Sequence, residues 1–86
     1  MIDEVEFLKE ILEKLVDEPG EVKVKKILDG NGTLLVFEVA EKDRRFVVGR
    51  QGSTFQAIRT IMNLIGYKNR TKINIKMNEP EKQDSV

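Results

Sequence analysis

The stretch Val47–Arg59 constrains the fold of this chain more than any other. It runs from the apolar pair Val47-Val48 through Gly49-Arg50-Gln51-Gly52 into an amphipathic pattern. Glycine has no Cβ and tolerates positive φ angles, so this spacing predicts a tight loop whose backbone can approach another molecule closely. A helix beginning directly after the loop would present unpaired N–H groups and a partial positive charge. Loop and helix start together predict a phosphate-binding site.

The apolar periodicity around this loop predicts three helices and three strands. Helical spacing covers residues 3–16, 41–48 and 53–65, and strand patterns cover 22–28, 33–40 and 73–77. Asp29-Gly30-Asn31-Gly32 contains two strong turn dipeptides and predicts a hairpin between the first two strands. The nearly continuous apolar run over 33–40 predicts a central strand. The order α-β-β-α-α-β predicts a two-layer α+β domain with helices on one face of a mixed three-stranded sheet.

The ends of these helices carry recognisable signals. Asp3 is expected to cap the first helix, and Pro19-Gly20 to end it. Ser53 or Thr54 is expected at the start of the third helix, and Gly66 as its C-terminal cap. Five apolar residues at helical spacing form the expected core stripe of that third helix: Phe55, Ile58, Ile61, Met62 and Ile65.

The charge of the chain is segregated although the net charge is zero. Residues 1–21 hold eight acids and two bases, whereas residues 44–76 hold eight bases and no acid. A wholly basic stretch indicates a local polyanion-binding face. The alternative is a solvated basic surface that balances the acidic first helix.

Length and composition exclude several classes of protein. With 86 residues the chain makes one domain, expected over residues 1–78, followed by a polar and flexible tail over 79–86. The absence of cysteine and histidine removes disulfides, thiolate metal sites and the commonest general base. We expect a cytoplasmic protein without a membrane span, cofactor, metal or small-molecule substrate. An enzyme is disfavoured, because the loop also lacks the spacing and the Lys-Ser/Thr pair of a P-loop.

Nearly the whole chain resembles a type II KH domain, and within that group the bacterial single-KH proteins of the KhpA type. The similarity lies in Leu15–Val24, in Val39–Asp43, in Val47–Gly52, and in Ala57–Thr60. A Gly-x-x-Gly loop that clamps about four nucleotides is a feature of KH domains. Relatives often carry a glycine shortly before the apolar pair, where this chain has Arg45-Phe46.

The resemblance implies that the chain binds single-stranded RNA, as a post-transcriptional regulator or RNA chaperone. Phosphates would contact the loop, and bases would lie on a groove between the third helix and the neighbouring strand. The residues expected to bind RNA are Gly49, Arg50, Gln51, Gly52, Ser53, Arg59, Arg45, Arg44 and Lys72.

Several of these residues also have an ordinary structural interpretation. The two loop glycines could form only a turn, and Arg59 could pair with Glu38 or with an N-terminal acid. Phe55 lies on the apolar stripe and is expected in the core. Tyr67 could stack on a base or pack at an interface, and Lys68, Arg70 and Lys76 are expected to be general surface charge.

A protein partner is the alternative to RNA as the main ligand. A single four-nucleotide site binds weakly, and pairing two sites raises avidity. The resemblance implies a homodimer or a heterodimer with a Jag-type KH protein. The second half of the third helix has more apolar residues than one stripe needs, which predicts a dimer contact around Ile61 and Leu64.

Overall fold

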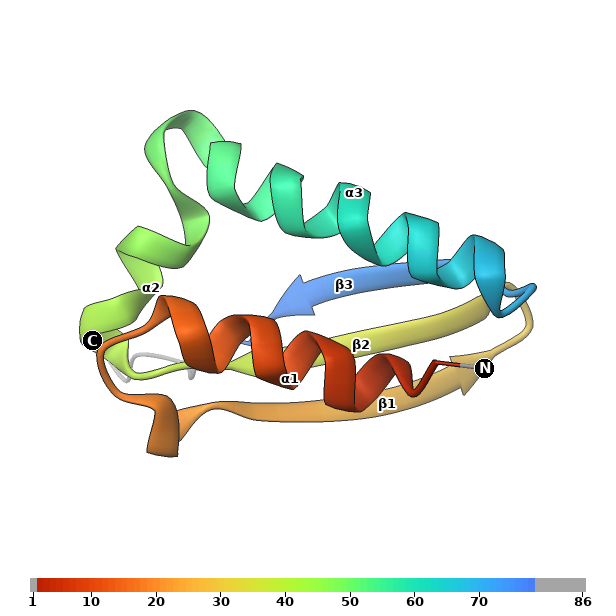
Figure 1. Cartoon of the computed structure of the whole chain (residues 1–86), viewed down its shortest axis with the longest axis horizontal. Helices are drawn as coiled ribbons and strands as arrows, with labels where there is room; N and C mark the ends of the chain where they lie inside the picture. Colours follow the sequence, from red (N-terminus) through yellow and green to blue (C-terminus); the bar gives the residue numbers. More distant parts are fainter. Residues whose placement is uncertain (1, 79–86) are drawn as a thin grey trace, which may run out of the picture.

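The computed structural model describes residues 2–78, in which three helices and three strands form two layers (Figure 1). The helices are α1 (Glu4–Leu15), α2 (Glu41–Val48) and α3 (Ser53–Lys68), and the strands are β1 (Lys23–Asp29), β2 (Gly32–Glu38) and β3 (Ile73–Met77). Short 3₁₀ helices precede β1 (η1, Pro19–Glu21) and α3 (η2, Arg50–Gly52). The predicted order α-β-β-α-α-β is confirmed, and the fold is the mixed α+β arrangement of a type II KH domain. The tail predicted over 79–86 lies outside the described residues.

The sheet has the order β1-β2-β3, so β2 is the central strand as predicted. β1 and β2 are antiparallel in an unbroken register from Lys23↔Glu38 to Asp29↔Gly32, and the predicted hairpin closes with a two-residue loop. β3 runs parallel to β2, with Leu35 opposite Ile75. Alternate β2 side chains are buried, and the others are only half-buried, because the helices cover one face of the sheet.

The core lies between that face and the helices. Asp3 caps α1 as expected, accepting hydrogen bonds from the N–H groups of Val5 and Glu6 at 3.1 and 3.2 Å. The apolar stripes of the helices meet the buried strand residues in one cluster, whose fully buried members include Leu8, Leu12, Leu35, Phe37, Val47, Met62 and Ile73. No helix among residues 2–78 has the length and apolarity needed to cross a bilayer.

Two predictions for α3 were wrong. Gly66 is not a C-terminal cap: α3 continues to Lys68, and the capping residue is Asn69. Gly66 is glycine because a Cβ there would lie 2.6 Å from the Thr71 carbonyl oxygen, where the chain turns back into β3. Ile61 was expected in the core stripe but is 40 % exposed, since the stripe that faces the sheet consists of Ile58, Met62 and Ile65.

Two polar clusters hold the helices in place. Near α2, the buried Asp43 carboxylate accepts hydrogen bonds from the N–H groups of Asp17 and Glu18 at 3.0 and 3.1 Å. After α3, the Asn69 side-chain amide donates to the Ile2 carbonyl at 2.6 Å and to the Glu4 carboxylate at 2.9 Å. These clusters fix the two ends of the α2–α3 unit against α1, and they thereby position the loop between α2 and α3.

Candidate functional site

The Gly49–Gly52 loop is a sharp connection between α2 and α3, which Figure 1 shows at the end of the molecule away from the start of β3. Gly49 has φ 80° and ψ 171°, a combination that is essentially restricted to glycine. Gln51 and Gly52 follow in the left-handed region, with φ of 56° and 76°. The loop is closed by a hydrogen bond of 3.1 Å from the Gly52 N–H to the Gly49 carbonyl. The backbone angles of these residues and this hydrogen bond therefore define the shape of the loop.

The two glycines are needed for different reasons. A Cβ at Gly49 would lie 2.4 Å from Thr54 Oγ1 and 2.6 Å from the Thr54 backbone nitrogen, so the loop folds directly onto the first turn of α3. A Cβ at Gly52 would meet nothing within 4 Å, and only its positive φ favours glycine. The open space beside Gly52 leaves that part of the backbone accessible to a ligand.

The first turn of α3 has no side-chain cap. The residue before the helix is Gly52, and Ser53 already has helical angles, φ −64° and ψ −40°. Ser53 therefore stands at the start of α3 as expected, but neither its side chain nor that of Thr54 caps the helix. Without a side-chain cap, the partial positive charge at this helix end is available to an anion.

Charged and polar side chains surround this helix start. Arg50, Gln51 and Ser53 are all exposed. Arg59, just over a turn further along α3 than Phe55, places its guanidinium 5.4 Å from the centroid of the Phe55 ring. It makes no ion pair with any of residues 2–78, and the anticipated pairing with Glu38 or an N-terminal acid is absent there. Its charge is therefore free to act beside the loop.

Phe55 connects the loop end to the core. Its ring centroid lies 6.2 Å from that of the buried Phe37, and the Arg59 guanidinium lies above the ring. The prediction that Phe55 belongs to the core is confirmed in part, because the ring packs against the core cluster but remains partly exposed. A cation held over an aromatic ring is oriented at low entropic cost.

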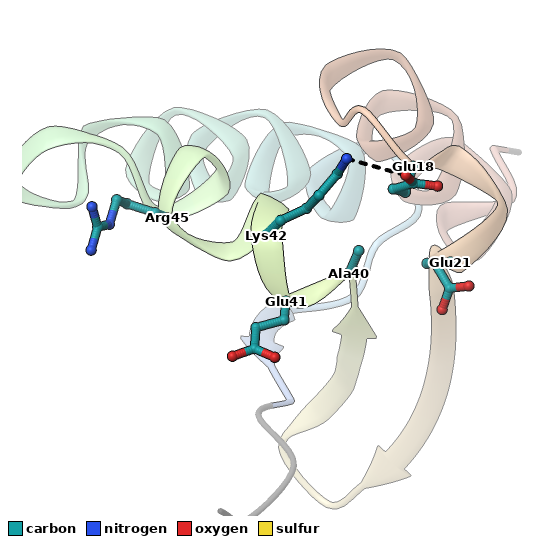
Figure 2. A pocket seen from close by; sticks show the side chains of 6 residues that line it. All are labelled: Glu18, Glu21, Ala40, Glu41, Lys42 and Arg45. Carbon is teal, nitrogen blue, oxygen red and sulfur yellow. Dashed lines mark ion pairs between the residues drawn. The ribbon is translucent and has the colours of Figure 1, made fainter.

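The predicted residues Arg44 and Arg45 lie on α2, one turn before the loop. Arg44 is half-buried, and its Nε atom is buried without a hydrogen-bond partner among residues 2–78. Arg45 is exposed and lines an open hollow of about 740 Å³ between η1 and α2 (Figure 2). Figure 2 shows its guanidinium pointing away from the carboxylates of this hollow.

That hollow is a poor site for a polyanion despite its volume. Its lining includes Glu18, Glu21 and Glu41. Lys42 extends toward Glu18, with Nζ 3.2 Å from the carboxylate, and this hydrogen bond raises the pKa of Lys42 (Figure 2). These acids make the surface of the hollow unfavourable for a phosphate, in contrast to the basic loop.

Lys72 lies at the opposite end of α3 from the loop. It is exposed just before β3, and its carbonyl accepts a hydrogen bond from the Thr33 N–H at 2.8 Å. There it lines a second hollow with Tyr67 and Arg70. The structure therefore places Arg50, Gln51 and Ser53 at the start of α3, Arg59 six residues further along the helix, and Lys72 in a separate group.

The loop end has the chemistry of anion binding. Its elements are a glycine backbone in the left-handed region, a helix N-terminus and exposed cationic or amide side chains. Among residues 2–78, no three histidine, cysteine, aspartate or glutamate side chains gather in a way that could hold a metal ion.

Comparison with known proteins places this geometry in a family. The model of the KhpA/KhpB KH domain matches residues 5–77. The RNA-binding protein KhpA of Chlamydia pneumoniae is 31 % identical over 74 residues, which cover 86 % of this chain and 95 % of the relative. The RNA-binding protein KhpA of Caldanaerobacter subterraneus subsp. tengcongensis is 32 % identical over 72 residues, covering 84 % and 96 %.

A solved structure supports the fold independently of close sequence similarity. A crystal structure of Era from Aquifex aeolicus bound to GDP and an aluminium fluoride superimposes with a TM-score of 0.59 at 15 % identity. The match covers 86 % of this chain and 29 % of that one, and it bears on the fold alone. With the family match spanning the loop, all three strands and all three helices, this chain belongs to the KhpA/KhpB family of KH domains.

Proposed function

We propose that this chain binds single-stranded RNA, with backbone phosphates held at the Gly49–Gly52 loop. The observation that carries the proposal is the left-handed glycine loop leading into an uncapped helix N-terminus beside the exposed Arg50. The KhpA relatives are named RNA-binding proteins, which supports the proposal. KH domains use such a loop to clamp the backbone of about four nucleotides.

The exposed residues divide between two tasks. Arg50, Gln51 and Ser53 lie at the start of α3, where they would contact phosphates together with the helix N-terminus. Arg59 on the next turn would contact the RNA strand as it passes along α3. Arg44 would supply a further positive charge, because it lies half-buried on α2 one turn before the loop.

The test is the double variant Arg50→Asp/Gln51→Asp, measured by fluorescence anisotropy with labelled single-stranded RNA. Aspartate tolerates the left-handed conformation of Gln51, so the fold should be kept while two carboxylates repel the phosphates. We expect binding to be abolished while the circular dichroism spectrum stays unchanged. For the parent, log K should fall with log salt concentration by about 0.7 per phosphate neutralised.

A matched control is Lys9→Gln/Lys14→Glu on α1, which lowers the net charge by the same amount and leaves the loop and α3 unchanged. This control should bind RNA nearly as well as the parent. Equal loss in both variants would show that only the overall charge matters, and undiminished binding in the loop variant would overturn the assignment of the site. Crosslinking to RNA in cells, with the loop variant as control, would test the proposed post-transcriptional or RNA-chaperone role in the cytoplasm.

A second candidate function is pairing with another KH protein, and an exposed apolar surface favours it. Ile61 and Leu64, separated by one turn of α3, are 40 % and 61 % exposed. We propose that a second copy of this chain, or a Jag-type KH protein, covers them, because two paired loops would raise avidity for one RNA.

Sedimentation of the parent, of Ile61→Glu and of Leu64→Glu tests this second candidate. A dimeric parent and monomeric variants are expected at tens of micromolar. An entirely monomeric parent would exclude the homodimer, and dimeric glutamate variants would place the interface elsewhere.

A further inference from the structure

The end of α3 opposite the loop carries the second hollow, which is basic, unlike the hollow beside α2. It has a volume of about 580 Å³ and is lined by Asn63, Gly66, Tyr67, Arg70, Thr71, Lys72 and Ile73. Two of these residues are cationic and none is acidic. A hollow of this size and charge fits a nucleotide better than it fits a cationic or purely apolar ligand.

Tyr67 is the aromatic side chain that lines this hollow. It is 85 % exposed, more than any other large hydrophobic residue among those described. It lies close in sequence to two cations, Arg70 and Lys72, both of which are also exposed. Exposed aromatic rings beside cationic side chains are how proteins hold single-stranded nucleic acid without strict sequence preference, since every base can stack.

The hollow lies on the same flank of α3 as part of the proposed RNA site. Arg59, Asn63 and Gly66 follow one another at helical spacing on α3. Gly66 faces the chain entering β3, where Arg70 and Lys72 line the hollow. This flank therefore leads from the loop end to the hollow along the side of β3. At about 1.5 Å per residue, the 16 residues of α3 separate the two ends by about 24 Å. Four nucleotides centred on the loop would extend only partway along α3, and a longer strand would reach the hollow.

The backbone builds the hollow before any ligand arrives. The Thr71 N–H donates to the Gly66 carbonyl at 2.9 Å, so the chain turns back tightly after α3. Arg70 has a left-handed backbone, with φ 58°, in this turn. Asn69 is held by Ile2 and Glu4, as described above. These contacts fix Arg70 and Tyr67 on a rigid support, which lowers the entropic cost of binding.

We infer that this hollow is a second nucleotide-binding site, in which a base stacks on Tyr67 and the adjoining phosphates pair with Arg70 and Lys72. The inference rests on the proposed RNA binding at the loop and extends it to strands longer than four nucleotides. The negative end of the α3 dipole lies here, so phosphates are held by cationic side chains and not by helix amides. The site therefore adds length preference more than it adds phosphate affinity.

The chain contains one tyrosine and no tryptophan, which makes Tyr67 its own reporter. Tyrosine fluorescence is measured while a uridine tetramer or a uridine decamer is added, and binding is followed separately by anisotropy of the labelled RNA. We expect the decamer to quench the fluorescence in step with binding. The tetramer, clamped at the loop, should bind more weakly and leave the fluorescence nearly unchanged.

Four variants separate stacking from other roles. Tyr67→Leu keeps an apolar side chain but removes the stacking face, and it should weaken decamer binding about tenfold while leaving tetramer binding unchanged. Tyr67→Phe should bind both RNAs as the parent does. Arg70→Asn, which suits the left-handed backbone, should weaken the decamer alone. Phe46→Leu removes another exposed aromatic ring, on α2, and should change neither affinity.

The outcomes distinguish this inference from the function on which it rests. If the decamer binds without quenching Tyr67, and Tyr67→Leu binds it as tightly as the parent, the second site is wrong while the loop site stands. If neither RNA binds the parent, both proposals fail. If Tyr67→Leu changes the sedimentation of the protein but not its affinity for RNA, the hollow is a protein contact and the inference is overturned.

Discussion

The two ends of α3 use similar backbone devices but differ in electrostatics. At each end a glycine sits where a Cβ would collide with the chain, Gly49 against Thr54 and Gly66 against Thr71. At each end a residue other than glycine has a left-handed backbone, Gln51 with φ 56° and Arg70 with φ 58°. The loop end, however, is the positive end of the helix dipole, and the other end is negative.

This difference implies two ways of binding the same polyanion. At the loop end, main-chain groups and the dipole favour phosphate whatever the neighbouring side chains are. At the far end, only the side chains of Tyr67, Arg70 and Lys72 favour RNA. The loop end should therefore dominate affinity and its salt dependence, and the far end should govern the preference for longer strands.

The largest expected loss of stability comes from adding a methyl group at Gly49 or Gly66, the glycines at the two ends of α3. Gly49→Ala adds a Cβ against the Thr54 backbone at φ 80°, and should lower the free energy of unfolding by about 3 kcal/mol. Gly66→Ala also meets backbone, but alanine gains helix propensity there, so about 1–2 kcal/mol should be lost. Urea denaturation of both variants gives the comparison.

Gly52→Ala is the control for backbone strain without collision. Its Cβ would meet nothing within 4 Å at φ 76°, so the loss should be about 1 kcal/mol. A Gly49→Ala variant no less stable than Gly52→Ala would mean that the loop does not fold onto Thr54 in solution.

Near the C-terminal end of α3 we expect a smaller loss of stability, and one that depends on pH. The hydrogen bond from Lys26 lowers the pKa of the buried Glu4, and the Nζ–Oε2 distance is 2.8 Å. Because the folded-state pKa lies below the unfolded one, the charged Glu4 stabilises the fold above pH 4.5, and this contribution is lost as pH falls through the folded pKa. Glu4→Gln should cost about 1 kcal/mol at neutral pH and progressively less in acid.

Urea denaturation of the parent and Glu4→Gln at pH 7 and pH 3 measures this. Glu18→Gln is the matched control at the loop end, where the exposed pair with Lys42 should contribute nothing measurable. If the Glu4→Gln difference were the same at both pH values, the ion pair with Lys26 would not be its cause.

The smallest expected change in stability comes from replacing the two non-glycine residues that have a left-handed backbone by glycine. Gln51→Gly and Arg70→Gly remove backbone strain but add entropy to the unfolded chain, so each should stabilise the fold by about 0.5 kcal/mol. Their effects on RNA should differ. Gln51→Gly removes one neutral phosphate contact but keeps the loop amides, so decamer binding should weaken by no more than about twofold. Arg70→Gly should weaken it further through loss of the cation.

Comparable loss of RNA binding in both glycine variants would contradict the proposal that the loop backbone supplies most of the affinity and the far end supplies the preference for longer strands. It would show that the Gln51 side chain, and not the loop backbone, holds the phosphate. Thermal unfolding of the same samples checks that neither variant has lost its fold.

The fold was largely predictable, because strong local signals set the elements. The Asp29–Gly32 turn, the Asp3 cap and the alternation in β3 all appear in the structure as expected. The wrong predictions concern residues whose environment is set by contacts with segments far away in the sequence. Gly66 looked like a helix end but is a helical residue that allows Thr71 to pack closely, and Ile61 matched the helical period but faces outward.

The loop site was predictable for the same local reason, and the far-end hollow was not. The spacing of Gly49 and Gly52 and the helix after them are visible in the chain. Lys72 and Tyr67 were noticed singly, but nothing local shows that they line one hollow. Their meeting depends on the tight turn between α3 and β3 and on the parallel pairing of β3 with β2.

The sequence by itself determined the order of the elements, the family and the shape of the Gly49–Gly52 loop, because glycine spacing and apolar periodicity act over a few residues. Only the tertiary structure decided how the eight bases of residues 44–76 are shared out. Arg50 and Arg59 lie near the loop, Arg45 lines the hollow beside α2, and Arg70 and Lys72 lie at the far end of α3. The physical reason is that a run of like charge is continuous along the chain, whereas a rigid helix about 24 Å long separates its two halves in space.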